Sequence, residues 1–514
     1  MTSSIEGPPP NPLVSRTFLR QVGYQQPRAA RSLKVEWRLA ELRLPRLARA
    51  LATPVSPKND LGANYPLRMT QIGREAIRFA WQYGMGTSAF FNLRRRTMNL
   101  PRIGRWITFM MFAFGTAAPA SAADERLLAA ARGAQLAVIG SLREMVLIES
   151  GSQDAAGLKV MSDYVEGRLR ALGAVTSRIQ AGIGPGDMIK GSFTGSGKRN
   201  FMLIAHMDTV YPRGILATEP YRQDGNKLYG PGIADAKGGI AVILHSLAIL
   251  RDAGWKDYAR LTVLFNPDEE VGSIGSGETI AALGDSHDVV LSYEPTAAKA
   301  VAKDEGVLLM AAGTAQARLA VKGIASHAGA APDQGRNALI ELSYQLLQTQ
   351  DIAKGIPNAQ LNWTTATAGS VRNQIPGQAE AGADVRLLTP DAADQLLAAL
   401  RAKVAEGRRV PDTETTVSLL VGRPPYVAGA KGMALAAKAQ AIYAELEGRK
   451  LMLHPSTGGG TDAGYAGRSG KAAVLESLGL AGWGYHAKDE YIEIDSIVPR
   501  LYLTTRLLNE LARE

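Results

Sequence analysis

Several residues that can ligate a metal ion or move a proton lie at the ends of apolar segments in this 514-residue sequence. His206 and Asp208 close the apolar run FMLIAHMD, which spans residues 201–208. On a β-strand, side chains two positions apart leave the same face, so this imidazole and this carboxylate would lie side by side. Such a pair is either a buried structural hydrogen bond or a metal-binding histidine with its supporting carboxylate. If further metal ligands from elsewhere in the chain converge on this pair, the metal-binding interpretation is favoured.

Acidic residues flank three more apolar segments. Asp235 lies in the tight turn GIADAKGG, which leads into an apolar helix, and Glu269 and Glu270 follow the buried strand LTVLF. Glu294 follows a third buried strand, VVLSY. In open α/β sheets, ligands bind at the carboxyl ends of the strands, and core packing does not require acidic residues there. His486, in the segment GWGYH near the C terminus, adds an imidazole whose neighbouring glycines indicate close approach of the backbone.

These residues can form a centre for two metal ions. His206 and Glu294 would hold one ion. Glu270 and His486 would hold the other, and Asp235 would bridge the two. The sequence contains no cysteine, so the ligand atoms are nitrogen and oxygen, which suit two zinc ions, although manganese or cobalt would also fit. Two adjacent cations would lower the pKa of a shared water molecule and polarise a substrate carbonyl group.

Glu269 is expected to act as a general base beside this centre. Adjacent residues after a strand point in different directions, so Glu270 can ligate a metal ion while Glu269 faces the water. Glu269 would take a proton from the water and pass it to the leaving amine. The alternative is that PDEE, residues 267–270, is a solvated acidic loop.

The elements that must position these residues alternate between strands and helices. This alternation predicts an α/β fold with a mostly parallel sheet. From Gly313 the pattern changes to alternating strand segments and two helices, which predict a compact α+β unit. We therefore expect this unit, residues 313–424, to be inserted between two parts of one catalytic domain, residues 124–312 and 425–514.

Positive charge is concentrated at the front of the chain. Residues 1–123 hold 18 of the 58 Lys and Arg residues but 5 of the 48 Asp and Glu residues, which leaves 40 basic and 43 acidic side chains for the remainder. The globular part therefore offers no basic surface for a phosphate backbone, and we expect no nucleic-acid partner.

A secretory signal peptide is predicted at residues 98–123. It consists of a short region with two arginines, the apolar core WITFMMFAFG and the small residues ASA. We expect translation to begin at Met98, so that residues 1–97 are a non-native or disordered basic extension. The mature protein would be periplasmic or secreted, with no stable membrane anchor after cleavage. The alternative is a genuine basic leader with an internal transmembrane anchor.

The chain resembles the M20 family of dizinc metallopeptidases over residues 124–514. The resemblance lies in seven ordered segments: HMDTV, GIADAKGG, DEEVGSIGS, YEP, SHAGAAP, GGGTDA and GYH. The glutamate carboxypeptidase branch, of the carboxypeptidase G type, is the most similar. It implies the metal ligands named above, Glu269 as general base, and a lid and dimerisation domain at residues 313–424 of a homodimer.

The resemblance implies roles for five further residues. Asp208 matches the residue that orients the first metal-binding histidine. His327 matches a histidine that reaches the active site of the partner subunit and stabilises the oxyanion. Asn373 and Arg386 match positions that bind the C-terminal carboxylate of the substrate. Arg423 matches a basic position near the glutamate side chain.

Other basic residues are assigned no role. His245 lies within an apolar helix, His287 in the segment GDSHD and His454 before a proline, so we treat all three as structural or surface residues. Glutamate-specific members of the family also use a lysine after the YEP segment. Neither Lys299 nor Lys303 is in register with that lysine.

The expected function is that of an exported carboxypeptidase. It would hydrolyse the amide bond of C-terminal glutamate in small N-acyl-glutamates such as folates, with metal-activated water and a glutamate base. An aminoacylase or a dipeptidase on the same scaffold is the alternative. A non-catalytic periplasmic binding protein is a third possibility, but it would require a broken ligand or base, and the sequence retains them all.

Overall fold

The computed structural model describes residues 122–514. The predicted basic extension (1–97) lies outside the described residues, as does the predicted signal peptide (98–123) apart from its last two residues. The described chain opens with α4 (Glu125–Val146), whose N-terminus is capped by the side chain of Asp124. The second helix, α5 (Ala155–Ala171), is capped by Asp154. Ser152, two residues before this cap, donates a hydrogen bond to the carboxylate of Asp208 at 2.8 Å.

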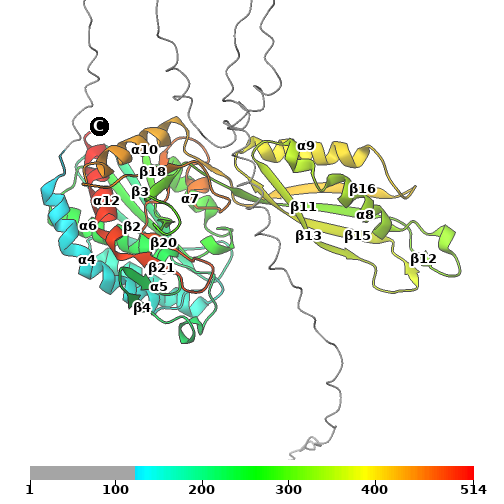
Figure 1. Ribbon diagram of the computed structural model, residues 1–514, viewed down its shortest axis with the longest axis horizontal. Coiled ribbons are helices and arrows are strands. Elements are labelled where there is room, and N and C mark those ends of the chain that lie inside the picture. The colour runs from blue at the N-terminus through cyan, green and yellow to red at the C-terminus, as the bar shows by residue number, and fades with distance from the viewer. Residues whose placement is uncertain (1–121) are drawn as a thin grey trace, which may run out of the picture. The chain divides into compact units, whose positions relative to one another are not determined.

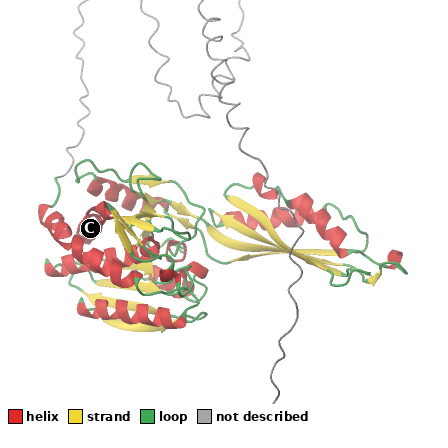
Figure 2. Cartoon of the chain, turned by 60° about the horizontal axis from the view of Figure 1, so that its bottom comes forward, coloured by secondary structure: helices red, strands yellow, loops and turns green. Residues whose placement is uncertain are grey.

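A six-stranded mixed sheet forms the centre of the main body, which comprises residues 122–312 and 425–514 (Figures 1 and 2). Its strand order is β1-β2-β6-β3-β7-β19. The last four strands in this order are parallel, whereas β2 pairs antiparallel with β6 and β1 pairs antiparallel with β2 at one edge. The strands are β1 (Val175–Gln180), β2 (Asp187–Thr194), β3 (Asn200–His206), β6 (Arg260–Asn266), β7 (Val289–Ser292) and β19 (Ala473–Leu475).

Helices cover both faces of this sheet, as the alternation of strand and helix predicts. Along β3, Phe201 and Leu203 point into the core shared with α4, α6 and α12, while Met202 and Ile204 point into the core shared with α7 and α11. The segment Ile233–Asp252, which contains α6, is long and apolar enough to cross a membrane, but it is buried in the main body. The remaining helices are α6 (Gly239–Asp252), α7 (Gly277–Asp285), α10 (Gly429–Tyr443), α11 (Ala463–Ala466) and α12 (Ile497–Ala512).

Residues 313–424, here called the inserted unit, form a second sheet of four antiparallel strands in the order β13-β15-β11-β16. Buried and exposed residues alternate along β11 and β15, because α8 and α9 cover one face of this sheet (Figure 1). A short strand pair, β12 and β14, extends from it. The elements are β11 (Gly313–Lys322), β12 (Ser326–His327), α8 (Ala338–Thr349), β13 (Ala359–Ala368), β14 (Gln374–Ile375), β15 (Gln378–Leu387), α9 (Asp391–Ala405) and β16 (Glu414–Val421).

Short strands complete the main body around the ends of the central strands. One small sheet has the order β4-β5-β21-β20-β8, and two further pairs are β18 with β9 and β10 with β17. These strands are β4 (Arg222–Asp224), β5 (Lys227–Tyr229), β8 (Thr296–Ala297), β9 (Gly306–Leu308), β10 (Met310–Ala311), β17 (Tyr426–Val427), β18 (Met452–His454), β20 (Ala481–Trp483) and β21 (Tyr491–Glu493). They hold the segments that carry His454 and His486.

Candidate active site

His206, Asp235 and Glu294 meet at the carboxyl ends of β3 and β7. Nε2 of His206 lies 2.9 Å from Oδ1 of Asp235 and 3.5 Å from Oε2 of Glu294. The imidazole of His206 is fully buried, and the two carboxylates are largely buried. Each residue can direct one ligand atom to a common point, so the three can hold one metal ion.

A second group shares Asp235 with the first. Nε2 of His486 lies 3.0 Å from Oε2 of Glu270 and 3.4 Å from Oδ2 of Asp235. Asp235 therefore presents one oxygen to each group, which is the arrangement of a bridging carboxylate. The structure brings together all five residues that the sequence predicted as metal ligands, and their imidazole and carboxylate donors fit divalent zinc, manganese or cobalt.

The electrostatics of this cluster favour a cation. Burial alone would lower the pKa of His206, but the carboxylates around it, that of Glu294 foremost, raise the pKa well above its usual range. Burial raises the pKa of Glu294 well above its usual range. Buried acidic groups that hold protons in this way release them when metal ions bind, so the residues present fit a metal centre.

Asp208 supports the site from behind. Its carboxylate accepts the backbone N–H groups of Glu269 and Glu270, both at 3.1 Å, in addition to the hydroxyl of Ser152. Nδ1 of His206 lies 3.0 Å from the carbonyl oxygen of Asp208 and 3.4 Å from its Oδ1. Asp208 therefore fixes the orientation of His206 and the position of the Glu269–Glu270 pair at once.

The turn that carries Asp235 is held by a residue that the sequence analysis did not single out. The buried carboxylate of Glu490 accepts the N–H groups of Gly232 and Ala234 at 2.8 Å and that of Asp235 at 3.0 Å. Gly232 has φ 69°, a conformation that glycine adopts without strain. Glu490 stands in the polar segment AKDEY, where no local pattern distinguishes it from a surface acid.

His486 approaches this turn from the C-terminal part of the chain. A Cβ atom on Gly482 would lie 2.6 Å from that of Ala234, so glycine is needed where the two segments pass. Gly484 has φ 82°, and His486 itself has φ 62°, an uncommon conformation for a residue with a side chain. The close backbone approach predicted from these glycines is confirmed.

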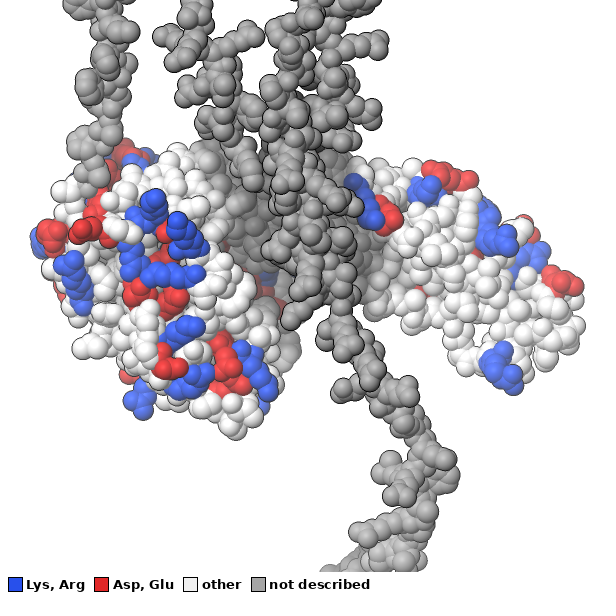
Figure 3. Space-filling model, viewed as in Figure 1, with Lys and Arg blue, Asp and Glu red and all other residues white. Residues whose placement is uncertain are grey.

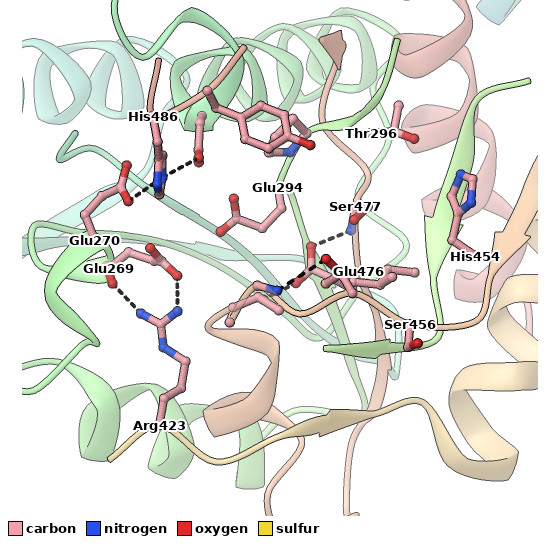
Figure 4. A pocket seen from close by; sticks show the side chains of 18 of the residues that line it. Glu269, Glu270, Glu294, Thr296, Arg423, His454, Ser456, Glu476, Ser477 and His486 are labelled. Carbon is pink, nitrogen blue, oxygen red and sulfur yellow. Dashed lines mark hydrogen bonds and ion pairs between the residues drawn. The ribbon is translucent and has the colours of Figure 1, made fainter. Parts of the chain in front are cut away.

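Glu269 forms a buried ion pair with Arg423. Arg423 Nη1 donates to Glu269 Oε1, and its Nη2 donates to the Glu269 carbonyl oxygen (Figure 4). Burial raises the pKa of Glu269, while the guanidinium of Arg423 opposes that rise. Ser273, which accepts a long hydrogen bond from Arg423, donates in turn to Asp462. In this structure Arg423 forms its ion pair with the predicted base, Glu269, whereas the family resemblance implies a position near the glutamate side chain of the substrate.

A cavity of about 790 Å³ opens beside the ligands and extends to β18. It is lined by Asp235, Glu270, Glu294 and His486, and by Glu269. Figure 4 shows Glu269, Glu270 and His486 on one side of this cavity, with His454 and Ser456 on the other. His454, treated from the sequence as structural or surface, therefore lines the same cavity as the metal ligands.

The inserted unit contributes only some of its predicted residues to this cavity. Arg386, on β15, lines it and pairs with Asp384 at 2.9 Å. His327 and Asn373 lie beside each other, since the N–H of Ala328 donates to the carbonyl oxygen of Asn373 at 2.9 Å. Neither is among the described residues that line the cavity. His327 is exposed, on β12.

Comparison with known proteins decides the family. The sequence pattern of peptidase family M20/M25/M40 matches residues 202–510. The chain belongs to this family. It is 46% identical over 402 residues to carboxypeptidase G2 from Pseudomonas sp. (strain RS-16), an alignment that covers 78% of this chain and 95% of that protein. It is therefore a metallopeptidase of the M20 family, related to a carboxypeptidase.

More distant similarities are found in sequence to a desuccinylase and in structure to an aminopeptidase. Succinyl-diaminopimelate desuccinylase from Stenotrophomonas maltophilia (strain R551-3) is 29% identical over 337 residues, which cover 61% of this chain and 85% of that enzyme. The crystal structure of aminopeptidase PepT from Bacillus cereus ATCC 10987 has a TM-score of 0.59 at 18% identity, covering 74% of this chain and 99% of that one. The latter likeness shows the mixed α/β fold.

Proposed function

We propose that this protein is an exported carboxypeptidase that hydrolyses the amide bond of a C-terminal amino acid in small N-acyl compounds, N-acyl-glutamates such as folates among them. The observation that carries the proposal is the pair of ligand groups that share Asp235, with Glu269 in the same cavity. The 46% identity to carboxypeptidase G2 supports it. Two zinc ions are the proposed cofactor, and manganese or cobalt would suit the same donors.

Different residues of the chain have different roles in the proposed hydrolysis. Metal ions held by the two groups would lower the pKa of a water molecule and polarise the scissile carbonyl group. Glu269 takes a proton from that water and delivers it to the nitrogen of the leaving amine. Arg386, which lines the cavity, binds the C-terminal carboxylate of the substrate and thereby sets the register of the scissile bond.

The inserted unit is proposed to be a lid and dimerisation domain. His327 accepts the N–H groups of Gly329 and Ala330 on Nδ1, at 3.2 and 3.0 Å, so a neutral ring carries its proton on Nε2. That N–H is the donor an oxyanion needs. Because His327 and Asn373 do not line the cavity of their own chain, we propose that they act in the active site of the second subunit of a homodimer.

The surface agrees with a small substrate rather than a nucleic acid. On the face shown in Figure 3, the Lys and Arg side chains of the described residues lie among Asp and Glu side chains. A phosphate backbone would require a basic field. Periplasmic or secreted localisation is proposed from the predicted signal peptide alone, and N-terminal sequencing of the exported protein would test it.

Replacement of Glu269 tests the catalytic assignment. Glu269→Gln should retain its bound metal and lose kcat by a factor of about 10² to 10⁴, because a general base contributes that much. Metal content by mass spectrometry and kcat on an N-acyl-glutamate are the two measurements. Glu278→Gln, an exposed glutamate on α7, is the matched control and should behave as the wild type. Undiminished turnover would refute Glu269 as the base, and loss of metal would make it a ligand.

A substrate panel separates the alternatives on this scaffold. One of the relatives is a desuccinylase, so removal of an acyl group from an amine is an alternative activity that the panel should include. We expect faster cleavage of folate and other N-acyl-glutamates than of acetylated amino acids, succinylated amines or free dipeptides. Higher kcat/KM on acetylated amino acids or free dipeptides would instead identify an aminoacylase or a dipeptidase.

A further inference from the structure

The end of the cavity away from Glu270 and His486 is polar. It is lined by His454 and Ser456, together with Thr296 and the buried residues Glu476 and Ser477 (Figure 4). A carboxypeptidase takes a chain end, so its leaving residue occupies the closed side of the site while the acyl group extends outwards. The exposed aromatic Trp483 lines another part of the cavity. The polar end, whose wall includes the buried residues Glu476 and Ser477, is the part of the cavity that suits the side chain of the leaving residue.

Backbone hydrogen bonds fix the segment that lines the polar end of the cavity. β18, which ends at His454, pairs in parallel with β9, and the N–H of Leu309 donates to the carbonyl oxygen of His454 at 2.9 Å. The N–H of Thr457 donates to Met310 at 3.1 Å, and that of Ala312 donates back to Thr457 at 3.2 Å. The segment that carries His454 and Ser456 is thus fixed at both ends.

The imidazole of His454 is held in one orientation. A Cβ atom on Gly306 would lie 2.3 Å from both Nε2 and Cδ2 of the ring, so this edge packs tightly against the glycine. Nε2 is buried and has no hydrogen-bond partner among the described residues. His454 lines the cavity, so Nδ1 is the ring nitrogen that remains available to a ligand there. Burial lowers the pKa of His454, so at neutral pH the ring is an uncharged hydrogen-bonding group.

Cations are scarce at this end of the cavity. Among residues 122–514, the lysine and arginine side chains that line the cavity are Arg386 and Arg423, and no lysine contributes. Arg423 is bound to Glu269, and Arg386 is assigned to the C-terminal carboxylate. Lys299 is on the surface, where it pairs with Asp495. A glutamate side chain would lie near the acidic Glu476 with no free cation beside it, which is costly in a desolvated pocket.

We propose that His454, with Ser456, reads the side chain of the leaving residue as a neutral hydrogen-bonding group, so that C-terminal glutamine is accepted at least as well as C-terminal glutamate. This inference rests on the proposed carboxypeptidase function and extends its substrate class. A neutral imidazole and hydroxyl groups can both donate to and accept from a side-chain amide. A single carboxylate gains no charge-assisted bond from them that would repay its desolvation.

The test compares N-benzoyl-glutamine, N-benzoyl-glutamate and N-benzoyl-alanine, which differ only in the leaving side chain. The wild-type enzyme with zinc should show a kcat/KM for glutamine equal to or above that for glutamate. His454→Lys should shift the ratio towards glutamate at least tenfold, because it supplies the missing cation. His454→Ala should raise KM for both polar substrates. Lys299→Ala is the matched control and should leave the ratio unchanged.

The outcomes separate the two proposals. A wild-type preference for glutamate above tenfold, or a ratio that His454→Lys does not move, would overturn this inference while leaving the carboxypeptidase in place. Continued cleavage of the alanine substrate by the variants shows that they are folded, since that side chain is too short to reach His454. If the wild-type enzyme cleaves none of the three substrates with zinc, manganese or cobalt, the proposed function fails, and this inference fails with it.

Discussion

Arg423 influences the pH range over which Glu269 can act as a base. Both side chains are less than a tenth exposed, so their interaction is weakly screened by solvent. Burial drives the pKa of Glu269 upwards, and the guanidinium limits the rise. A base must be ionised to accept a proton, so the positive neighbour keeps Glu269 competent at lower pH than burial alone would allow.

Replacing Arg423 by methionine should therefore move the acid limb of the activity profile. In Arg423→Met the pKa of Glu269 rises, less of the base is ionised at a given pH, and kcat/KM should fall to half its plateau value at a higher pH than in the wild type. At pH 7 we expect a loss of at least about tenfold. The measurement is kcat/KM between pH 5 and 9. Arg423→Lys retains the charge and should shift the limb less; superimposable profiles would contradict the pairing.

At the scale of elements, α6 passes through the core with one buried titratable side chain, that of His245. Nε2 of His245 lies 2.9 Å from Oγ of Ser141 on α4 and 3.4 Å from Arg168 on α5. Burial, followed by the charge of Arg168, lowers the pKa of His245 to about 4. The packing of these three helices therefore depends on a neutral imidazole.

Acid should loosen this contact. The unfolded chain protonates His245 near pH 6.5, whereas the folded chain does not do so until about pH 4, so stability present at neutral pH is lost as the pH falls through this window. Between pH 7.5 and 5 this one group should remove about 2 kcal/mol from the free energy of unfolding. Urea unfolding of His245→Gln should show a correspondingly smaller loss. His327→Gln, at an exposed histidine, should lose as much as the wild type; an equal loss in His245→Gln would refute the argument.

The elements that the sequence predicted share one property: their apolar residues are in phase with a strand or a helix. That is why the sequence predicts β3, β6 and β7 with acidic residues or histidine at their ends, and two helices within the inserted unit. β1 was missed because most of its residues are exposed, and it gives no apolar run. Glu490 and His454 were missed because their roles arise from contacts with distant segments, which no local pattern encodes.

At the scale of the whole molecule, the metal centre joins parts of the chain that are far apart in sequence. His206 and Asp235 precede the inserted unit, while His486 follows it. A metal ion bound between Glu270 and His486 therefore links the two portions of the main body. Binding to the folded state alone stabilises it by mass action, by about 2.7 kcal/mol at a ligand concentration one hundred times Kd.

Removing the metal should then lower the thermal stability of the entire main body. Dialysis against a chelator should reduce Tm by several degrees, and added zinc should restore it. Differential scanning calorimetry provides the readout. Asp235→Asn, which impairs both ligand groups, should have a Tm that responds little to zinc. A wild-type Tm that is indifferent to zinc, in protein shown to bind the ion, would mean that the centre does not hold the two portions together.

The position of the inserted unit also has a consequence for the order of folding. β19 forms the edge of the central sheet beside β7, and α12 packs against α4 and α6, so the main body needs its last segments to close its core. The inserted unit has its own core of residues between 315 and 419 and can be completed earlier during synthesis. The inserted unit can therefore fold while the last part of the main body, residues 425–514, is still to be synthesised. Capture of both metal ions, which requires His486, would mark the moment at which that body is complete.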